Sequence, residues 1–171
     1  MTINLPRLAT EDDAAELVPL FCSGKDGMHL ATHVCSQENR ENLLKSMTLK
    51  CASECVWMVT IGSMPAGILL FDRLTTSIGF VVVSENLRGQ GIGPTLVRHI
   101  QSMPDVSRLH AEARNDSSKR MLRKCEFWPN GRKSHDDFPL FFWRRNFPLF
   151  FWRRKSADQA RRAARGRRSP A

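Results

Sequence analysis

Two stretches in the first third of the chain repeat apolar side chains at the spacing of an amphipathic helix. They lie within residues 14–21 and 37–50, where apolar positions recur every three or four residues, as on the core-facing side of a helix. A short strand is predicted over residues 3–8, before the first helix. Residues 22–36, which include two glycines and two histidines, are predicted to form an irregular connection between the helices.

From residue 56 onward the apolar pattern is typical of β-strands. Two such runs, 56–61 and 66–71, flank the turn sequence Gly62-Ser63-Met64-Pro65, and together they predict a hairpin. A third run over residues 77–83 ends in three consecutive valines, which favour a strand buried on both faces.

The second half of the chain alternates between the two periods. Residues 95–100 predict a helix that ends before Pro104, residues 108–113 a strand, and residues 116–124 a further helix. The apolar residues 140–143 predict a last strand. This order of elements predicts an α/β fold, with a mixed sheet and helices packed around it as layers.

The net charge of the chain, +9, is concentrated at its C-terminus. Residues 153–171 carry +7 and the preceding residues only +2, so the basic character belongs to the tail rather than to the folded domain. A strongly basic domain, which would indicate a nucleic-acid-binding fold, is therefore not expected.

Length and composition are those of one globular domain. The chain has 171 residues, of which 42% are hydrophobic and 25% charged, and both values are ordinary for a folded soluble protein. There is no apolar run of about 18 residues and no signal-peptide pattern at the N-terminus, so a cytoplasmic protein without a membrane span is expected. The odd number of cysteines, five, favours reduced thiols over a disulfide framework.

The strongest functional signal is a glycine-rich loop between the valine strand and the helix that follows it. Gly89, Gly91 and Gly93 stand at alternate positions, where missing Cβ atoms let a phosphate approach the backbone. The helix start adds N–H groups without intrahelical partners, and Pro94 is tolerated there because it has no N–H to lose. The pattern predicts a phosphate or pyrophosphate site.

The spacing of this loop excludes two common nucleotide motifs. It lacks the third glycine of a dinucleotide fingerprint, and no Gly-Lys-Ser/Thr follows for a P-loop. Arg88, Gly91 and Gly93 instead form R-x-x-G-x-G, which resembles the acyl-CoA pyrophosphate loop of the GNAT acetyltransferase superfamily. Residues 7–10 resemble the start of that family's first strand and helix. Further downstream, the positions that resemble its second motif are Asn115, Ser118, Lys124 and Phe127.

The resemblance covers about residues 1–146 and implies a mixed, mostly antiparallel sheet flanked by about four helices. It also implies transfer of an acetyl group from acetyl-CoA to a primary amine of a small molecule or a protein. The valine strand would pair with the pantetheine arm, the glycine loop would hold the pyrophosphate, and an asparagine would contact the cofactor near its reacting end. The residues that the resemblance assigns to cofactor binding are Val81, Val82, Val83, Arg88, Gly89, Gln90, Gly91, Ile92, Gly93, Pro94 and Asn115.

The sequence departs from the family's pattern at two positions. Leu122 stands where many members have a tyrosine that protonates the leaving thiolate, and the chain contains no tyrosine at all. Glu126 stands before Phe127 where a glycine is expected. The first departure leaves a second hypothesis open, namely a catalytically weak module that binds acyl-CoA.

Two side chains of the strand 108–113 are candidates for the catalytic base. Glu112 is the first, because the family often has a glutamate on this strand, and His110 shares its face. The structural alternative is that both are only polar residues at the end of a sheet. No metal is expected, because His29, His33 and Cys35 lack a paired ligand set at zinc spacing.

The C-terminus contains a direct repeat. Residues 138–145 and 147–154 are identical, and the first copy is predicted to supply the last strand of the sheet. The second copy is assigned, with the basic residues after it, to an extension over 147–171, so that the acetyltransferase-like domain is 1–146. Nucleic acid, for instance a tRNA acceptor, remains an alternative partner through this tail. A homodimer is compatible with the sequence but not indicated by it.

Overall fold

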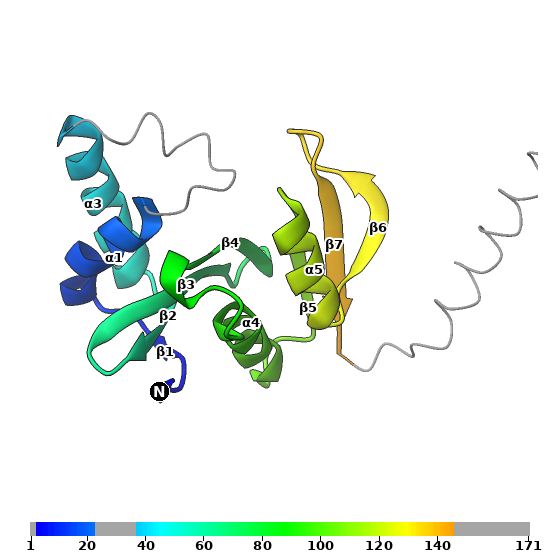
Figure 1. Ribbon diagram of the computed structural model, residues 1–171. Helices are drawn as coiled ribbons and strands as arrows, with labels where there is room; N and C mark the ends of the chain where they lie inside the picture. The colour runs from blue at the N-terminus through cyan, green and yellow to red at the C-terminus, as the bar shows by residue number, and fades with distance from the viewer. Residues whose placement is uncertain (1–2, 23–36, 146–171) are drawn as a thin grey trace, which may run out of the picture.

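The computed structural model describes residues 3–22 and 37–145 (Figure 1). The predicted connection over 22–36, with His29, His33 and Cys35, lies outside the described residues except for Cys22, and so does the extension over 147–171. The helices and short helical turns are η1 (Glu11–Asp13), α1 (Ala14–Cys22), α3 (Gln37–Ala52), η2 (Glu85–Leu87), α4 (Ile92–Ser102) and α5 (Asp116–Lys124). The strands are β1 (Arg7–Leu8), β2 (Val56–Ile61), β3 (Met64–Asp72), β4 (Ser77–Val83), β5 (Arg108–Glu112), β6 (Trp128–Lys133) and β7 (Pro139–Arg144).

The strands form one mixed sheet of seven in the order β1-β2-β3-β4-β5-β7-β6. Every neighbouring pair is antiparallel except β4 and β5, which are parallel. With four α-helices in the described residues, this confirms the predicted α/β fold and its mostly antiparallel sheet. The sequence order of the other strands and helices is the one that the hydrophobic pattern predicts, but no strand was predicted at β6.

Alternating side chains of the central strands bury two separate clusters, one on each face of the sheet. On β2, Val56 and Met58 join a cluster with α1 and α3, whereas Trp57 and Val59 join a larger cluster with α4 and α5. This is the period of two that an extended strand imposes on its side chains. The sheet is therefore the middle of three layers, as Figure 1 shows for β2–β4.

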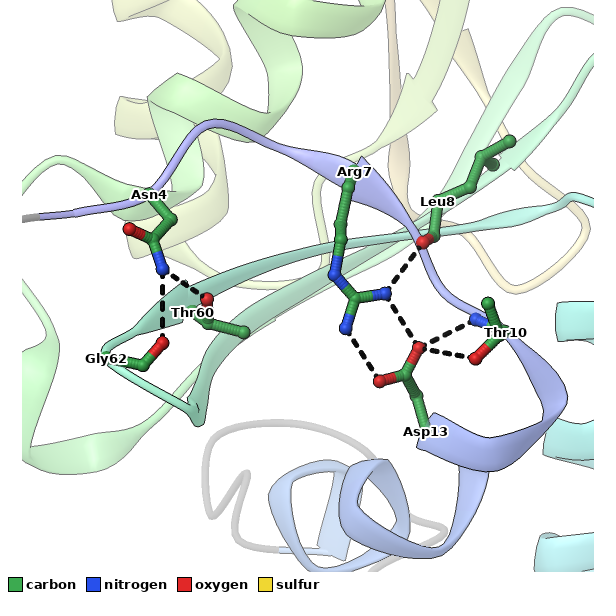
Figure 2. Close-up of polar contacts among 7 residues, drawn as sticks. All are labelled: Asn4, Arg7, Leu8, Thr10, Asp13, Thr60 and Gly62. Carbon is green, nitrogen blue, oxygen red and sulfur yellow. Dashed lines mark hydrogen bonds and ion pairs between the residues drawn. The ribbon is translucent and has the colours of Figure 1, made fainter.

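The first strand and the first helix are joined by an ion pair at their junction (Figure 2). The guanidinium of Arg7 donates to both carboxylate oxygens of Asp13, at 2.8 and 2.7 Å, and Thr10 donates to Asp13 from its backbone N–H at 2.7 Å. On the same segment, the amide of Asn4 donates to Thr60 and Gly62. The contacts of Asn4 hold the N-terminal segment against β2 and the turn after it, and the pair of Arg7 and Asp13 joins the edge strand β1 to the helical segment that follows.

Two single residues have local effects in this architecture. Pro19 lies inside α1, three residues before its end, so it removes one backbone hydrogen bond without ending the helix there. Cys125 is buried, and burial raises the pKa of its thiol to about 11. Within the described residues, no helix is long and apolar enough to cross a membrane.

Candidate functional site

The separation of β4 from β5 opens a cavity in the described structure. The two strands pair only at Ser77 with His110 and at Ile78 with Ala111. Beyond this point β4 continues for five residues, 79–83, while β5 ends at Glu112. The cavity has a volume of about 450 Å³ and is bounded by β4, the loop after it, the start of α4, the end of β5 and α5.

Most residues that the sequence assigns to a binding site line this cavity. The predicted residues on its wall are Val81, Val82, Val83, Arg88, Gly89, Gly91, Ile92, Gly93, Pro94 and Asn115. Gln90 belongs to the same loop but is exposed and does not line the cavity. The loop, the valine strand and the start of the α5 helix, which are separated in sequence, are therefore brought to one place by the fold.

The valine strand is covered on both faces but not fully buried. Val82 is 9% exposed and packs toward α1 and α3, whereas Val81 and Val83 pack against the opposite cluster and remain half-buried. The prediction of burial on both faces is therefore wrong for Val81 and Val83. They keep their exposure because the neighbouring strand has moved away and left the cavity at this edge.

Two glycines of the loop have backbone conformations that favour glycine. Gly89 and Gly91 have φ angles of 83° and 87°, and a Cβ at either position would meet nothing within 4 Å. Open space and a left-handed backbone are the properties expected where a ligand approaches the main chain. Gly91 is also the N-cap of α4, so the first N–H groups of that helix lie beside the cavity.

Gly93 has a packing role in addition to its place on the cavity wall. It is buried, and a Cβ there would lie 2.9 Å from the sulfur of Met121 on α5. Its missing side chain therefore permits the close packing of α4 against α5. Its part in holding an anion stays a prediction.

Asn115 caps α5 where the helix begins at the cavity. Its side-chain oxygen accepts a hydrogen bond of 2.7 Å from the backbone N–H of Ser118, and the Ser118 hydroxyl accepts one of 3.1 Å from the backbone N–H of Asn115. This reciprocal capping fixes the rotamer of the asparagine.

The two candidate bases are placed differently. Glu112 is half-buried and lines the cavity, while His110 is exposed and does not line it. The Glu112 carboxylate lies 3.4 Å from the guanidinium of Arg114, which in turn lies 3.8 Å from Asp136 and over the ring of Phe138. Among the predicted acid–base groups, Glu112 is thus the one that reaches the cavity.

Leu122 faces the core and not the cavity. It is 1% exposed and belongs to the cluster between the sheet and the helices α4 and α5. The neighbouring residue that lines the cavity is Met121. No side chain with an acidic hydroxyl therefore stands at this point of the α5 helix.

Sequence reasoning missed the cationic groups of the cavity wall other than Arg88. Arg114, Arg120 and Lys124 also line it, and Glu112 is the one carboxylate among the described lining residues. Arg120 and Lys124 are four residues apart on a predicted helix, a spacing that places two side chains on one face. That spacing was the available signal, but the near-neutral charge of the whole domain concealed it.

Comparisons with known proteins agree with this architecture. The model of the acetyltransferase (GNAT) family matches residues 28–127, more than half of the chain. No curated protein sequence matches the chain. Solved structures similar to it include a GNAT-family acetyltransferase from Bacillus cereus, with a TM-score of 0.64 and 15% identity over 84% of this chain and 98% of that one.

Two further structures extend the comparison. The PaiA N-acetyltransferase from Thermoplasma acidophilum, solved in complex with coenzyme A, has a TM-score of 0.65 and 12% identity over 84% of this chain and 99% of that one. YjaB from Escherichia coli has a TM-score of 0.56 and 22% identity over 83% of this chain and 96% of that one. At such identities these structures support the fold, and the family match supports the membership.

Proposed function

Since the chain belongs to the acetyltransferase (GNAT) family, we propose that it moves an acetyl group from acetyl-CoA to a primary amine of a small molecule or a protein. The observation that carries the proposal is the cavity between the parted strands β4 and β5, into which the glycine loop and the start of α4 face. When bound, acetyl-CoA supplies a thioester carbonyl and a thiolate leaving group.

The residues of the cavity fit this ligand in charge and in backbone geometry. The pyrophosphate is assigned to Arg88 and the loop 89–94, where positive-φ glycines and the N-terminus of α4 present N–H groups without a blocking side chain. The cationic side chains Arg114, Arg120 and Lys124 supply further positive charge. The Thermoplasma acidophilum protein, which has a similar fold, was solved in complex with coenzyme A, and this supports coenzyme A as the class of ligand.

The backbone of 81–83 is assigned two tasks. It offers main-chain groups to the pantetheine arm along an edge that β5 leaves without a strand partner in the described structure. One of its N–H groups donates to the acetyl oxygen, where negative charge develops during attack. A donor fixed at that position contributes on the order of 10²–10³ in rate.

Glu112 is assigned the role of general base. An alkylammonium acceptor has a pKa near 10.4 and must lose a proton before its nitrogen attacks. A carboxylate oxygen of Glu112 on the cavity wall accepts that proton. Arg114, at 3.4 Å, orients the carboxylate by a charge-assisted contact. His110 is the alternative base, although it lies outside the cavity wall.

The thiolate departs without a tyrosine to protonate it. A thiol with a pKa near 8.5 is a fair leaving group at neutral pH, and a missing general acid costs roughly 10²–10⁴ in rate. Because Leu122 is buried in the core, a catalytically weak acyl-CoA-binding module is the second candidate function. The nucleic-acid alternative depends on the basic tail, which lies outside the described residues.

Isothermal titration with acetyl-CoA, and with NAD and ATP as controls, tests the binding proposal. Micromolar affinity for acetyl-CoA alone is expected, and Gly91→Glu should weaken it by about 100-fold or more because the new carboxylate and its strained backbone stand against the pyrophosphate. Gly62→Glu is the matched control. Gly62 also has a positive φ, 61°, and open space, but lies in the hairpin turn away from the cavity. Equal affinity of the two variants would contradict the assignment of the loop.

The base is tested by the pH dependence of turnover. Glu112→Gln should lower kcat/KM about 10²–10⁴-fold at neutral pH and recover part of it at high pH, where the free amine forms without help. Asp136→Asn is the control, because it also removes a carboxylate beside Arg114 but none from the cavity wall. A pH-independent loss that both variants share would exclude Glu112 as the base.

A further inference from the structure

The strand β7 has an identical copy in the chain immediately after it. Residues 138–145 and 147–154 both read Phe-Pro-Leu-Phe-Phe-Trp-Arg-Arg. The first copy forms β7, an internal strand between β5 and β6, and the second lies outside the described residues. Each side chain that β7 places in the sheet therefore recurs nine residues later.

The contacts of β7 depend only on residues that both copies contain. Phe141 is 2% exposed and belongs to the larger core cluster, on the side of α4 and α5, and Trp143 packs against the same cluster. Five residues of β7 pair with β5, from Leu140 opposite Glu112 to Arg144 opposite Arg108. In the second copy, the counterparts of the two core residues are Phe150 and Trp152.

The residue that fixes the end of β7 is duplicated as well. The guanidinium of Arg145 donates to the carbonyl oxygens of Gln101, at 3.0 Å, and of Met103, and its backbone N–H donates to Ser107. These bonds join the end of the strand to the segment between α4 and β5. Arg154 stands at the same place in the second copy.

We propose that the position of β7 in the sheet accepts either copy, so that the chain has two registers. In the described register, residues 139–144 lie between β5 and β6. In the shifted register, residues 148–153 take that place within the same molecule, and the first copy becomes part of the connection from β6. The two registers exclude each other because one position in the sheet is shared.

The described register is favoured by its connection. A turn over 134–138 joins β6 to β7, with the N–H of Ser134 donating to Phe138 at 2.8 Å and an ion pair of 2.7 Å between Lys133 and Asp137. The shifted register lengthens this connection to 134–147. A loop nearly three times as long costs more entropy to close, and this lowers the population of the shifted register roughly fivefold. The loss of the turn contacts lowers that population further. The shifted register is thus the minor one.

The shift reaches the candidate active site through the same turn. Asp136 lies 3.8 Å from Arg114, and Phe138 lies under the Arg114 guanidinium. Arg114 lines the cavity beside Glu112. In the shifted register a longer and more apolar connection replaces this turn. The residues beside Arg114, where an acceptor would approach the cavity, therefore differ between the two registers.

A charge placed in the core position of each copy tests the proposal. An aspartate in place of a buried phenylalanine unfolds the protein unless another segment takes the place of that strand. Phe141→Asp in the full chain is expected to remain a folded monomer with a Tm lower by several degrees, because the second copy takes the position. Phe150→Asp is expected to keep the wild-type Tm, and the double variant to be unfolded, as measured by near-UV circular dichroism and light scattering.

Three results would overturn the two-register proposal. In the first, Phe141→Asp is as completely unfolded as the double variant. In the second, Phe141→Asp and the double variant are both folded. In the third, Phe141→Asp folds only as a dimer. The last result would indicate exchange of the strand between chains.

Engineered disulfides report the register directly. Arg108 lies opposite Arg144 on the exposed part of the sheet, so Arg108→Cys with Arg144→Cys joins the strands in the described register. Arg108→Cys with Arg153→Cys joins them in the shifted one. In the Phe141→Asp background only the second pair is expected to close, and in the Phe150→Asp background only the first, as identified by mass spectrometry of tryptic peptides. The same pair closing in both backgrounds would overturn the proposal.

Discussion

Glu126 occupies a backbone position that ordinarily favours glycine. It follows the end of α5 with a φ of 62°, while its N–H donates to Arg123 and the N–H of Phe127 donates to Leu122. These two bonds are those of a Schellman motif, whose left-handed residue is usually glycine because a Cβ is strained there. The second departure from the family's sequence pattern is therefore a strained helix end with unchanged hydrogen bonding.

Relieving this strain should stabilise the protein. Glu126→Gly is expected to raise the free energy of unfolding by about 0.5–1 kcal/mol, measured by urea denaturation. Glu126→Ala removes the same charge but keeps the Cβ, and it should gain little. Equal gains from both substitutions would assign the effect to the charge instead of the backbone.

Single residues also show what a sequence pattern leaves open. The spacing of Gly89, Gly91 and Gly93 predicted an anion site, and the first two have the expected conformation and open space. The third also lines the cavity, but a Cβ there would lie 2.9 Å from the sulfur of Met121, so its missing side chain also permits the packing of α4 on α5. The glycine pattern shows where side chains are absent. It does not show which residue lies close to each glycine, because here that residue belongs to a helix distant in the sequence.

At the scale of elements, the junction of β1 and η1–α1 is held by one carboxylate. The Arg7 guanidinium, together with the backbone N–H and hydroxyl of Thr10, holds the pKa of the Asp13 carboxyl well below its usual range. A group whose pKa is lowered by folding stabilises the folded state at any pH above its unfolded value, near 3.9. That contribution is lost as the pH falls below this value toward the folded pKa.

The pH dependence of Asp13→Asn follows from this. At pH 7 the substitution should lower the free energy of unfolding by about 1–2 kcal/mol, since it breaks a charge-assisted fork and weakens a helix cap, while the half-exposed Arg7 limits the effect. At pH 2 the difference from the wild type should be much smaller. Asp12→Asn, one residue earlier, is the control and should change little at either pH.

Most elements could be predicted from the sequence because their periodicity is local. The β2–β3 hairpin, β4 and α5 all lie within about two residues of the predicted bounds. The parting of β4 and β5 could not be predicted, since it depends on how many residues of two distant strands pair. The cavity and its cationic wall follow from that pairing, so the loop could be predicted from the sequence but the space beside it could not.

At the scale of the whole molecule, charge is distributed unevenly within a nearly neutral domain. Arg88, Arg114, Arg120 and Lys124 meet on one cavity wall, although residues before 153 carry only +2 in total. Local concentration of one sign produces a field that attracts an anionic ligand even when the net charge is small. The basic tail is not needed for this effect.

Salt should reveal which of these charges contribute to binding. Arg120→Gln with Lys124→Gln is expected to weaken acetyl-CoA affinity roughly tenfold at low ionic strength, and much less at 1 M salt, where the Debye length is about 3 Å. Arg40→Gln with Lys50→Gln removes the same charge from α3, away from the cavity, and is the control. Calorimetric titrations across the salt series measure both, and identical slopes would contradict a role for the wall.

The parting of β4 and β5 has a consequence for how such a site can change over generations. The cavity is opened by the paths of two backbones and not by a set of small side chains. Substitutions on its wall can therefore change its shape or charge without closing it, as long as the two residue pairs that join the start of β4 to β5 are kept. The backbone that forms the cavity and the side chains that line it can therefore change separately. A descendant sequence can bind a new acceptor while its fold stays the same.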